Sequence, residues 1–204
     1  MDPEPQVVPD GASVLLYWLP LGAGGRSVRW NGRVFEFLVA RHQHRAVRDL
    51  YHSALEVRVG DDAFVIEMTP VWGNDVPERG VVREGSVGSP LLGRSALFRY
   101  EVRRWRGGSI PDLDEAVDSP LPVSNDLSRA RHLLDLVPQV PAATWGRDEL
   151  HLGEMWNSNS LISWLLARSD HAVFDLAPPV NGRAPGWQAG LALAERQQRP
   201  AGGR

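Results

Sequence analysis

A polar cluster that runs directly into an apolar helical stripe, over residues 154–166, constrains the fold of this chain more than any other feature. Leu161, Trp164 and Leu165 follow the i, i+3, i+4 spacing of one helix face, which predicts a buried helix over residues 159–168. We therefore expect this helix to pack on a sheet that other parts of the chain supply.

Asn157, Ser158 and Asn159 stand at the start of this helix, and all three are favourable N-cap residues. Two interpretations of the cluster are open. The first is a helix cap without chemistry. The second is an active site, because a helix N-terminus offers unpaired N–H groups and a partial positive charge that stabilise an oxyanion.

Composition excludes several classes of protein. The 204 residues, 43% hydrophobic and 23% charged with a net charge of −3, are typical of one folded domain. We expect that domain over residues 13–196, between a flexible arm (1–12) and a disordered tail (197–204). The absence of cysteine excludes disulfides, thiolate metal sites and a cysteine nucleophile.

The net charge and the hydropathy of the sequence limit the classes of binding partner and the cellular location that we expect. The near-neutral charge gives no electrostatic reason to expect binding to nucleic acid or to an anionic membrane. The sequence has no apolar run long enough to span a membrane, and its first residues lack the order of a signal peptide. We therefore expect a cytoplasmic protein.

An alternating segment predicts a β-hairpin. Apolar and charged residues alternate over 55–59, residues 60–62 form a turn, and residues 63–68 favour a strand. Antiparallel pairing about this turn makes His52 and Glu67 near neighbours. A histidine beside a carboxylate can act as a base with its orienting partner; the alternative is a surface histidine beside a surface glutamate.

Three short motifs together resemble those of the circularly permuted papain-like proteins, the group that includes lecithin:retinol acyltransferase and the PPPDE peptidases. The motifs are Tyr-His-Ser-Ala-Leu-Glu-Val (51–57), Phe-Val-Ile-Glu-Met (64–68) and Trp-Asn-Ser-Asn-Ser-Leu (156–161). In that family a histidine lies on the first strand of a hairpin, a polar residue on the second strand orients it, and a cysteine nucleophile begins a helix. The resemblance implies these roles for His52, Glu67 and Ser158, with Ser160 as a lesser candidate nucleophile.

The serine at position 158 departs from the family, which has cysteine there. A serine hydroxyl is the weaker nucleophile at neutral pH and needs a well-aligned base, so Ser158 is either an active nucleophile or a natural or engineered loss of one. The resemblance implies a hydrolase or acyltransferase that acts on an amide, ester or thioester bond. In that mechanism Asn157 and Asn159, at the helix N-terminus, position the substrate and stabilise the oxyanion.

The alternative function is a catalytically inactive domain that binds a peptide or a lipid-like ligand in the same cleft. The residues expected to rim that cleft are Trp72, Trp156 and Trp187. Both functions imply a peptide, a protein or an acyl-bearing small molecule as partner, and neither requires a cofactor or a metal. A third interpretation, an unrelated α+β fold with no site here, holds if the hairpin and the 159–168 helix are not neighbours.

Other clusters have simpler structural interpretations. The glycine-rich segment 22–25 lacks the lysine of a P-loop and is interpreted as a turn. His42 and His44 are two positions apart on a predicted helix and do not face the same way, which favours a solvated face over a metal site. The acidic segment 112–118 lacks the spacing of an EF-hand.

Two clusters keep a functional alternative. Arg99, Arg103 and Arg104 lie on an alternating segment and could recognise a carboxylate or phosphate, although a polar sheet face is the simpler interpretation. His151 lies close in sequence to two glutamates, which could form an alternative base pair or a weak metal site.

These patterns predict an α+β domain: a small, mainly antiparallel sheet with helices packed on it. The strands are expected near 13–19, 51–59, 63–69 and 97–105, and the helices near 33–45, 126–137 and 159–168, while residues 187–196 could form a short closing helix.

Overall fold

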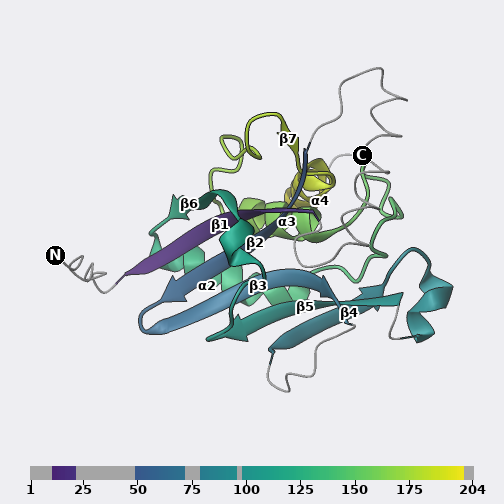
Figure 1. The fold of residues 1–204 in the computed structure, drawn as a ribbon, viewed down its shortest axis with the longest axis horizontal. Coiled ribbons are helices and arrows are strands. Elements are labelled where there is room, and N and C mark those ends of the chain that lie inside the picture. The colour runs from purple at the N-terminus through teal and green to yellow at the C-terminus, as the bar shows by residue number, and fades with distance from the viewer. Residues whose placement is uncertain (1–10, 22–48, 72–78, 96–97, 200–204) are drawn as a thin grey trace.

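The computed structural model describes residues 11–21, 49–71, 79–95 and 98–199. In these ranges six strands form one antiparallel sheet in the order β4-β5-β3-β2-β1-β6, and a short β7 pairs in parallel with the start of β2 (Figure 1). The predicted α+β class is confirmed, because α2 and α3 pack on this sheet and α4 packs on α3.

The elements have the following bounds. The strands are β1 Ala12–Pro20, β2 Asp49–Val59, β3 Asp62–Pro70, β4 Val81–Ser86, β5 Arg99–Arg106, β6 Val117–Ser124 and β7 Gly182–Arg183. The α-helices are α2 Leu127–Leu136, α3 Ser158–Arg168 and α4 Trp187–Gln198. Three short 3₁₀ helices are η1 Pro90–Arg94, η3 Leu113–Glu115 and η4 Val137–Gln139.

The predicted hairpin is formed by β2 and β3. Leu55 pairs with Ile66 and Val59 pairs with Asp62, so the turn lies at residues 60–61 as the alternation indicates. Gly60 has a φ of +58°, a backbone conformation that glycine adopts without the steric cost of a Cβ.

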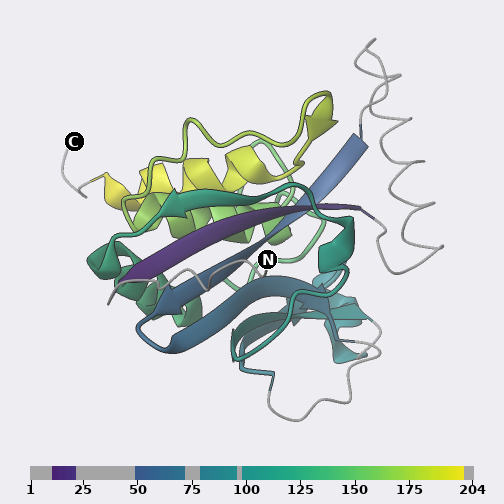
Figure 2. The ribbon, with the colours of Figure 1, turned by 60° about the vertical axis from the view of Figure 1, so that its left-hand side comes forward.

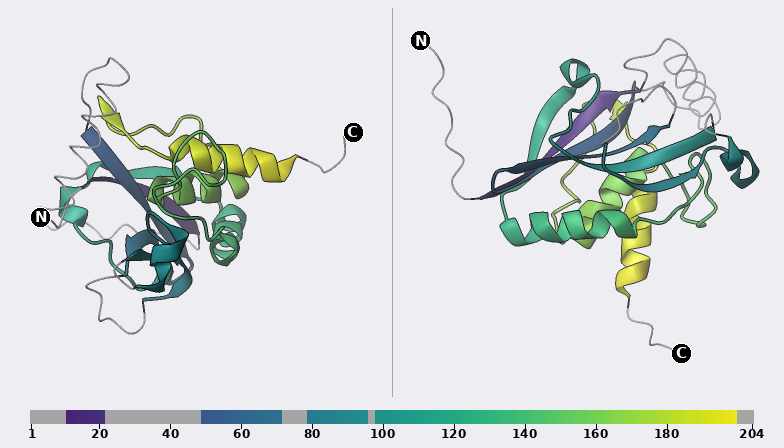
Figure 3. Two further views of the ribbon diagram at one scale, coloured as in Figure 1. Left: turned by 90° about the vertical axis from the view of Figure 1, so that its right-hand side faces the viewer. Right: turned by 90° about the horizontal axis from the view of Figure 1, so that it is seen from below.

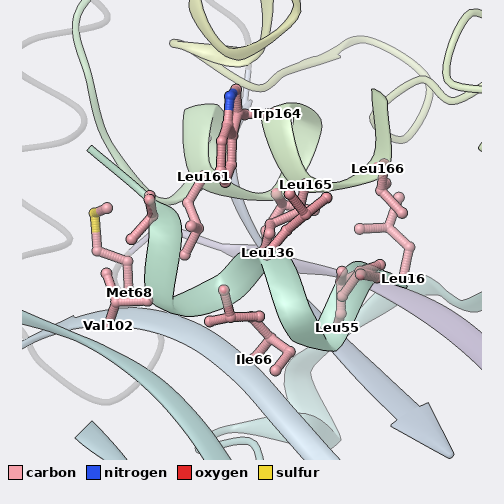
Figure 4. Close-up of a cluster of buried hydrophobic side chains, with 14 of the residues drawn as sticks. Leu16, Leu55, Ile66, Met68, Val102, Leu136, Leu161, Trp164, Leu165 and Leu166 are labelled. Atoms are coloured by element: carbon pink, nitrogen blue, oxygen red, sulfur yellow. The ribbon is translucent and has the colours of Figure 1, made fainter. Parts of the chain in front are cut away.

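The α-helices cover one face of the sheet, which we call the inner face (Figures 2 and 3). Successive side chains of a strand point to opposite faces, so every second strand residue reaches this side. Leu16, Leu55 and Ile66 are fully buried there with Leu161 and Leu165 of α3 (Figure 4). Leu161 and Leu165 of the predicted apolar stripe therefore pack on the sheet, whereas Trp164 of the same stripe lies on the side of α3 that faces α4.

The opposite face of the sheet, the outer face, carries a smaller apolar cluster. Leu19, Ala54 and Val65 are buried there with Tyr17 and Ile110. These strand residues alternate with the residues of the inner core, as the period of two requires. The sheet is therefore buried on both faces around its central strands.

Three strands, β4, β6 and β7, are not predicted by the sequence. Segment 79–90 is rich in glycine, which favours loops, but it contains the edge strand β4. β6 contains Pro120 and Pro122, which weaken a strand prediction yet are tolerated because β6 is the other edge of the sheet. The predicted helix at 33–45 lies outside the described residues.

The ends of the predicted domain differ slightly from the structure. β1 begins at Ala12, within the predicted arm, and α4 continues to Gln198, past the predicted domain end at 196. In the described ranges, none of the helices combines the length and the apolar character needed to cross a membrane.

Candidate functional site at the start of helix α3

The start of α3 is a complete capping box. The Oδ1 atom of Asn157 accepts hydrogen bonds from the backbone N–H of Asn159 (2.9 Å) and of Ser160 (3.3 Å). Ser160 Oγ in turn accepts from the backbone N–H of Asn157 at 3.2 Å. The predicted N-cap is confirmed, and it occupies two of the N–H groups that an oxyanion hole at this helix end would need.

Asn159 connects α3 to the sheet. The residue is only 1% exposed, and its side-chain amide donates to the backbone oxygens of Tyr51 and Pro185, each at 2.9 Å. Its Oδ1 accepts from Ser53 Oγ, also at 2.9 Å. Because Tyr51 and Ser53 belong to β2, the polar cluster and the predicted hairpin are neighbours, as the sequence-based mechanism required.

Further polar residues of the cluster hold the start of α4. Ser160 Oγ donates to the backbone oxygen of Gly186 at 2.8 Å, and Ser163 Oγ donates to that of Trp187 at 2.7 Å. Glu154 accepts from the backbone N–H of Gly186 at 2.8 Å. Gly186 has a φ of +86°, which favours glycine at this turn. The cluster therefore fixes the chain entering α4.

Ser158 is the first residue of α3, and its side chain is buried, with 4% exposure. Among the described residues, no hydrogen bond engages its hydroxyl, in contrast to Ser160 and Ser163. No described histidine or carboxylate therefore activates this hydroxyl by hydrogen bonding.

The tryptophans expected at a cleft rim lie elsewhere. Trp156 and Trp187 are 1% and 7% exposed and belong to the inner core, and the ring centroids of Trp187 and Trp18 are 5.1 Å apart. Large aromatic side chains remove the most apolar area from water when they are buried, so their burial stabilises the fold strongly. Trp72 lies outside the described residues.

His52 lies on the outer face of the sheet, whereas α3 lies on the inner face. Ser53 points to α3 through its bond to Asn159, and adjacent strand residues point to opposite faces, so His52 points away from Ser158. Ala54, which shares the face of His52, packs in the outer apolar cluster. The structure therefore brings Ser158, Asn157 and Asn159 together but not His52.

Burial is the main cause of the shifted pKa of His52. It lowers the pKa of the imidazole to about 4, and Asp112 nearby opposes the shift. His52 is consequently neutral at neutral pH.

Glu67 shares the outer face with His52 but is bound to an arginine. Arg103 Nη1 donates to Glu67 Oε1 at 2.7 Å, and Arg103 Nε donates to Glu101 Oε1 at 2.5 Å. Arg79 completes the network by donating to both oxygens of Glu101. Burial raises the pKa of Glu67, and the Arg103 charge opposes that rise. These contacts make Glu67 part of a buried ion-pair network.

The alternation of apolar and polar residues in β2 already indicates on which face of the sheet His52 lies. Leu55 and Val57 are core residues, so the even-numbered residues of the same strand, Glu56 and His52 included, share the other face. A face assignment would have separated His52 from any helix packed on the Leu55 side.

An open polar pocket, which we call the β4 pocket, was not predicted. It lies between the end of β4, η1, the start of β5 and residues 142–149, with a cavity volume of about 480 Å³. Its polar lining residues are Glu84, Ser86, Arg94, Arg99, Thr144 and Glu149. Of these, Arg99 belongs to the predicted arginine cluster, and Glu149 is one of the two glutamates close in sequence to His151.

The remaining candidate clusters make structural contacts. Arg104 donates to the backbone oxygen of Leu134 at 3.1 Å, and Glu149 accepts from the backbone N–H of Thr144 at 2.6 Å. No group of three or more metal-ligating side chains occurs in the part of the chain that the structure describes.

Comparisons with protein-family models, with curated proteins and with solved structures find no match to this chain. The resemblance to the permuted papain-like proteins therefore stays a prediction.

Proposed function

We propose that this chain is a catalytically silent domain that binds a peptide. The observation that carries the proposal is the position of His52 and Ser158 on opposite faces of the sheet. A serine nucleophile needs its base within hydrogen-bond reach, and a strand residue cannot reach through its own sheet.

A hydrolase or acyltransferase would require three rearrangements. His52 would have to reach the inner face, Glu67 would have to leave Arg103, and Asn157 would have to release the N–H groups that it caps. Each change breaks a contact that is buried in the folded chain, where unpaired polar groups cost most. The geometry therefore favours binding over catalysis.

A peptide fits the described surface better than a lipid-like ligand does. Six of the ten described residues that line the β4 pocket carry charged or hydroxyl side chains, which can hydrogen-bond to peptide groups and would be left without partners beside an acyl chain. Its volume lies in the range of small-ligand sites, of the order of 300–1,000 Å³.

The catalytic alternative can be tested with a single introduced thiol. Because the chain has no cysteine, Ser158→Cys supplies the only thiol for alkylation by iodoacetamide. We expect slow alkylation in the folded protein, an unchanged rate when His52→Asn is added, and fast alkylation in urea. A rate that falls when His52 is replaced would instead support a catalytic pair, as would labelling of wild-type Ser158 by a fluorophosphonate probe.

Binding is tested directly by selection from a displayed library of short random peptides. We expect the folded wild type to enrich peptides reproducibly, and synthetic versions to bind in fluorescence anisotropy. Failure to enrich any peptide would overturn the proposed function.

A further inference from the structure

Arg99, at the start of β5, has an exposed and replaceable partner in the β4 pocket. Its Nη2 atom contacts Glu84 Oε2 at 2.8 Å, and the two side chains are 36% and 45% exposed. Its Nε atom is buried without a hydrogen-bond partner among the described residues. A guanidinium can donate two parallel hydrogen bonds to one carboxylate, so a ligand carboxylate would engage Arg99 more completely than Glu84 does.

A second arginine lines the same pocket. Arg94 is the last residue of η1 and is exposed, and in the described ranges it forms no ion pair. Arg94 and Arg99 together give one side of the β4 pocket positive charge that Glu84 neutralises only in part. This side suits a carboxylate.

On the side of the β4 pocket formed by residues 142–149, the side chains provide hydrogen-bond acceptors. Glu149 Oε1 is held in place by the backbone N–H of Thr144 at 2.6 Å, and Thr144 Oγ1 lies 3.1 Å from Ser86 Oγ. A carboxylate here favours N–H donors and repels a compact dianion such as phosphate. A peptide provides both complementary groups: a carboxylate for the arginines and backbone N–H donors for Glu149.

Exposed apolar side chains flank the arginines in sequence. Leu91 in η1 is 85% exposed, and Phe98, directly before Arg99, is 41% exposed. Leu91 follows Pro90 and Phe98 precedes Arg99, and both Pro90 and Arg99 line the β4 pocket, so each apolar side chain is attached next to a residue of the pocket and offers apolar surface to a neighbouring ligand side chain.

We propose that the β4 pocket binds a peptide through a carboxylate that lies next to an apolar side chain. Arg99 and Arg94 hold the carboxylate, and Leu91 and Phe98 contact the apolar side chain. The inference rests on the proposed function and adds the class of peptide and the residues that select it. The carboxylate is either an Asp or Glu side chain or the C-terminal carboxylate of the peptide.

The test uses an array of short synthetic peptides. Each carries Asp, Glu, Asn or Gln next to Leu, Phe, Ser or Gly, with either a free or an amidated C-terminus, and affinities of hits are measured by fluorescence anisotropy. We expect peptides with a carboxylate next to Leu or Phe to bind, and loss of the carboxylate to weaken binding at least about tenfold. Comparison of the free and amidated termini identifies which carboxylate is recognised.

Two variants that are expected to change peptide affinity in opposite directions test whether the peptide binds in the β4 pocket. Arg99→Gln should weaken binding at least about tenfold. Glu84→Gln, which removes the competing carboxylate, should strengthen binding about two- to fivefold. Arg58→Gln is the matched control, because Arg58 forms a similar exposed ion pair with Glu56 (2.7 Å) on β2. Circular dichroism and urea unfolding confirm that each variant is folded.

The outcomes separate the two proposals. Peptides that bind the wild type but are unaffected by Arg99→Gln and Glu84→Gln would overturn the β4 pocket inference and leave the proposed function standing. Equal binding of carboxylate and amide peptides would overturn it as well. A folded wild type that binds no peptide on the array and selects none from the random library would overturn both.

Discussion

Asn159 and Ser158 are adjacent, buried polar residues with different roles. Asn159 bonds to β2 and to Pro185 in the segment before α4, whereas the described residues offer the Ser158 hydroxyl no hydrogen bond. Removing a buried hydrogen-bonding group costs most when its partners stay buried and unpaired. The structural importance of the cluster therefore resides in Asn159.

Asn159→Ala is predicted to lower the free energy of unfolding by about 2–4 kcal/mol, because it removes the partner of Ser53 and of the Tyr51 backbone oxygen, whereas the Pro185 oxygen keeps its hydrogen bond from Asn157. Urea denaturation followed by circular dichroism measures the change. Ser158→Ala is the control and should change stability by less than about 1 kcal/mol. Equal losses in the two variants would contradict the assignment.

His52 should make stability depend on pH in a defined window. Its pKa is lowered from 6.5 to about 4 in the folded state, so the unfolded state binds more protons between these values. The contribution is complete above about pH 6.5 and is lost as the pH falls to about 4, and it amounts to at most about 3 kcal/mol.

His52→Asn is therefore predicted to flatten the dependence of unfolding free energy on pH between about 6.5 and 4. Urea unfolding at a series of pH values measures the slope. His132→Asn, which replaces an exposed histidine of α2, should keep the wild-type slope. A variant curve parallel to that of the wild type would show that burial of His52 does not set its protonation.

At the scale of elements, the contact between α3 and α4 is close enough to require glycine. A Cβ added at Gly190 would lie 2.1 Å from Ser163 Oγ and 2.2 Å from the backbone oxygen of Ser160. Trp164 strengthens the same contact, since its indole N–H donates to Gln197 of α4 at 2.9 Å. Figure 4 shows Trp164 on the side of α3 away from the sheet residues.

Gly190→Ala is predicted to destabilise the protein by about 1–3 kcal/mol, although alanine is the better helix former by about 1 kcal/mol. The clash with backbone atoms of α3 outweighs the propensity. Thermal and urea unfolding measure the change. Gln188→Ala, at an exposed position of α4, should be neutral or slightly stabilising. Stabilisation by Gly190→Ala would mean that the helices lie farther apart.

The elements that could be predicted from the sequence are those in which the spacing of apolar residues matches the residues that are buried in the fold. The hairpin turn at Gly60 and the apolar stripe of α3 are examples, because alternation and helical spacing directly reflect burial. β4 was missed because its residues are mostly exposed or half-buried, so no alternation marks it. The prolines of β6 are tolerated by its edge position, which depends on the whole sheet.

At the scale of the whole molecule, the sheet separates the two motifs that the sequence analysis joined. Asn159 reaches β2 at Tyr51 and Ser53, so the predicted proximity of the motifs is present in the structure. The side on which His52 lies follows from strand parity, which a comparison of short motifs does not take into account. The β4 pocket could not be predicted, because Arg99 and Glu149 are brought together only by the fold.

This separation predicts a pattern of energetic coupling. Ser53 and Asn159 are in contact, so the cycle of Ser53→Ala with Asn159→Ala should show a coupling energy of about 0.5–3 kcal/mol. His52 is adjacent to Ser53 in sequence but lies on the other face, so His52→Asn and Asn159→Ala should be additive within about 0.5 kcal/mol. Urea unfolding of the single and double variants, at a pH above 6.5 where His52 is neutral, measures both cycles. Coupling of His52 to Asn159 as strong as that of Ser53 would place the imidazole on the α3 side of the sheet and restore the catalytic interpretation.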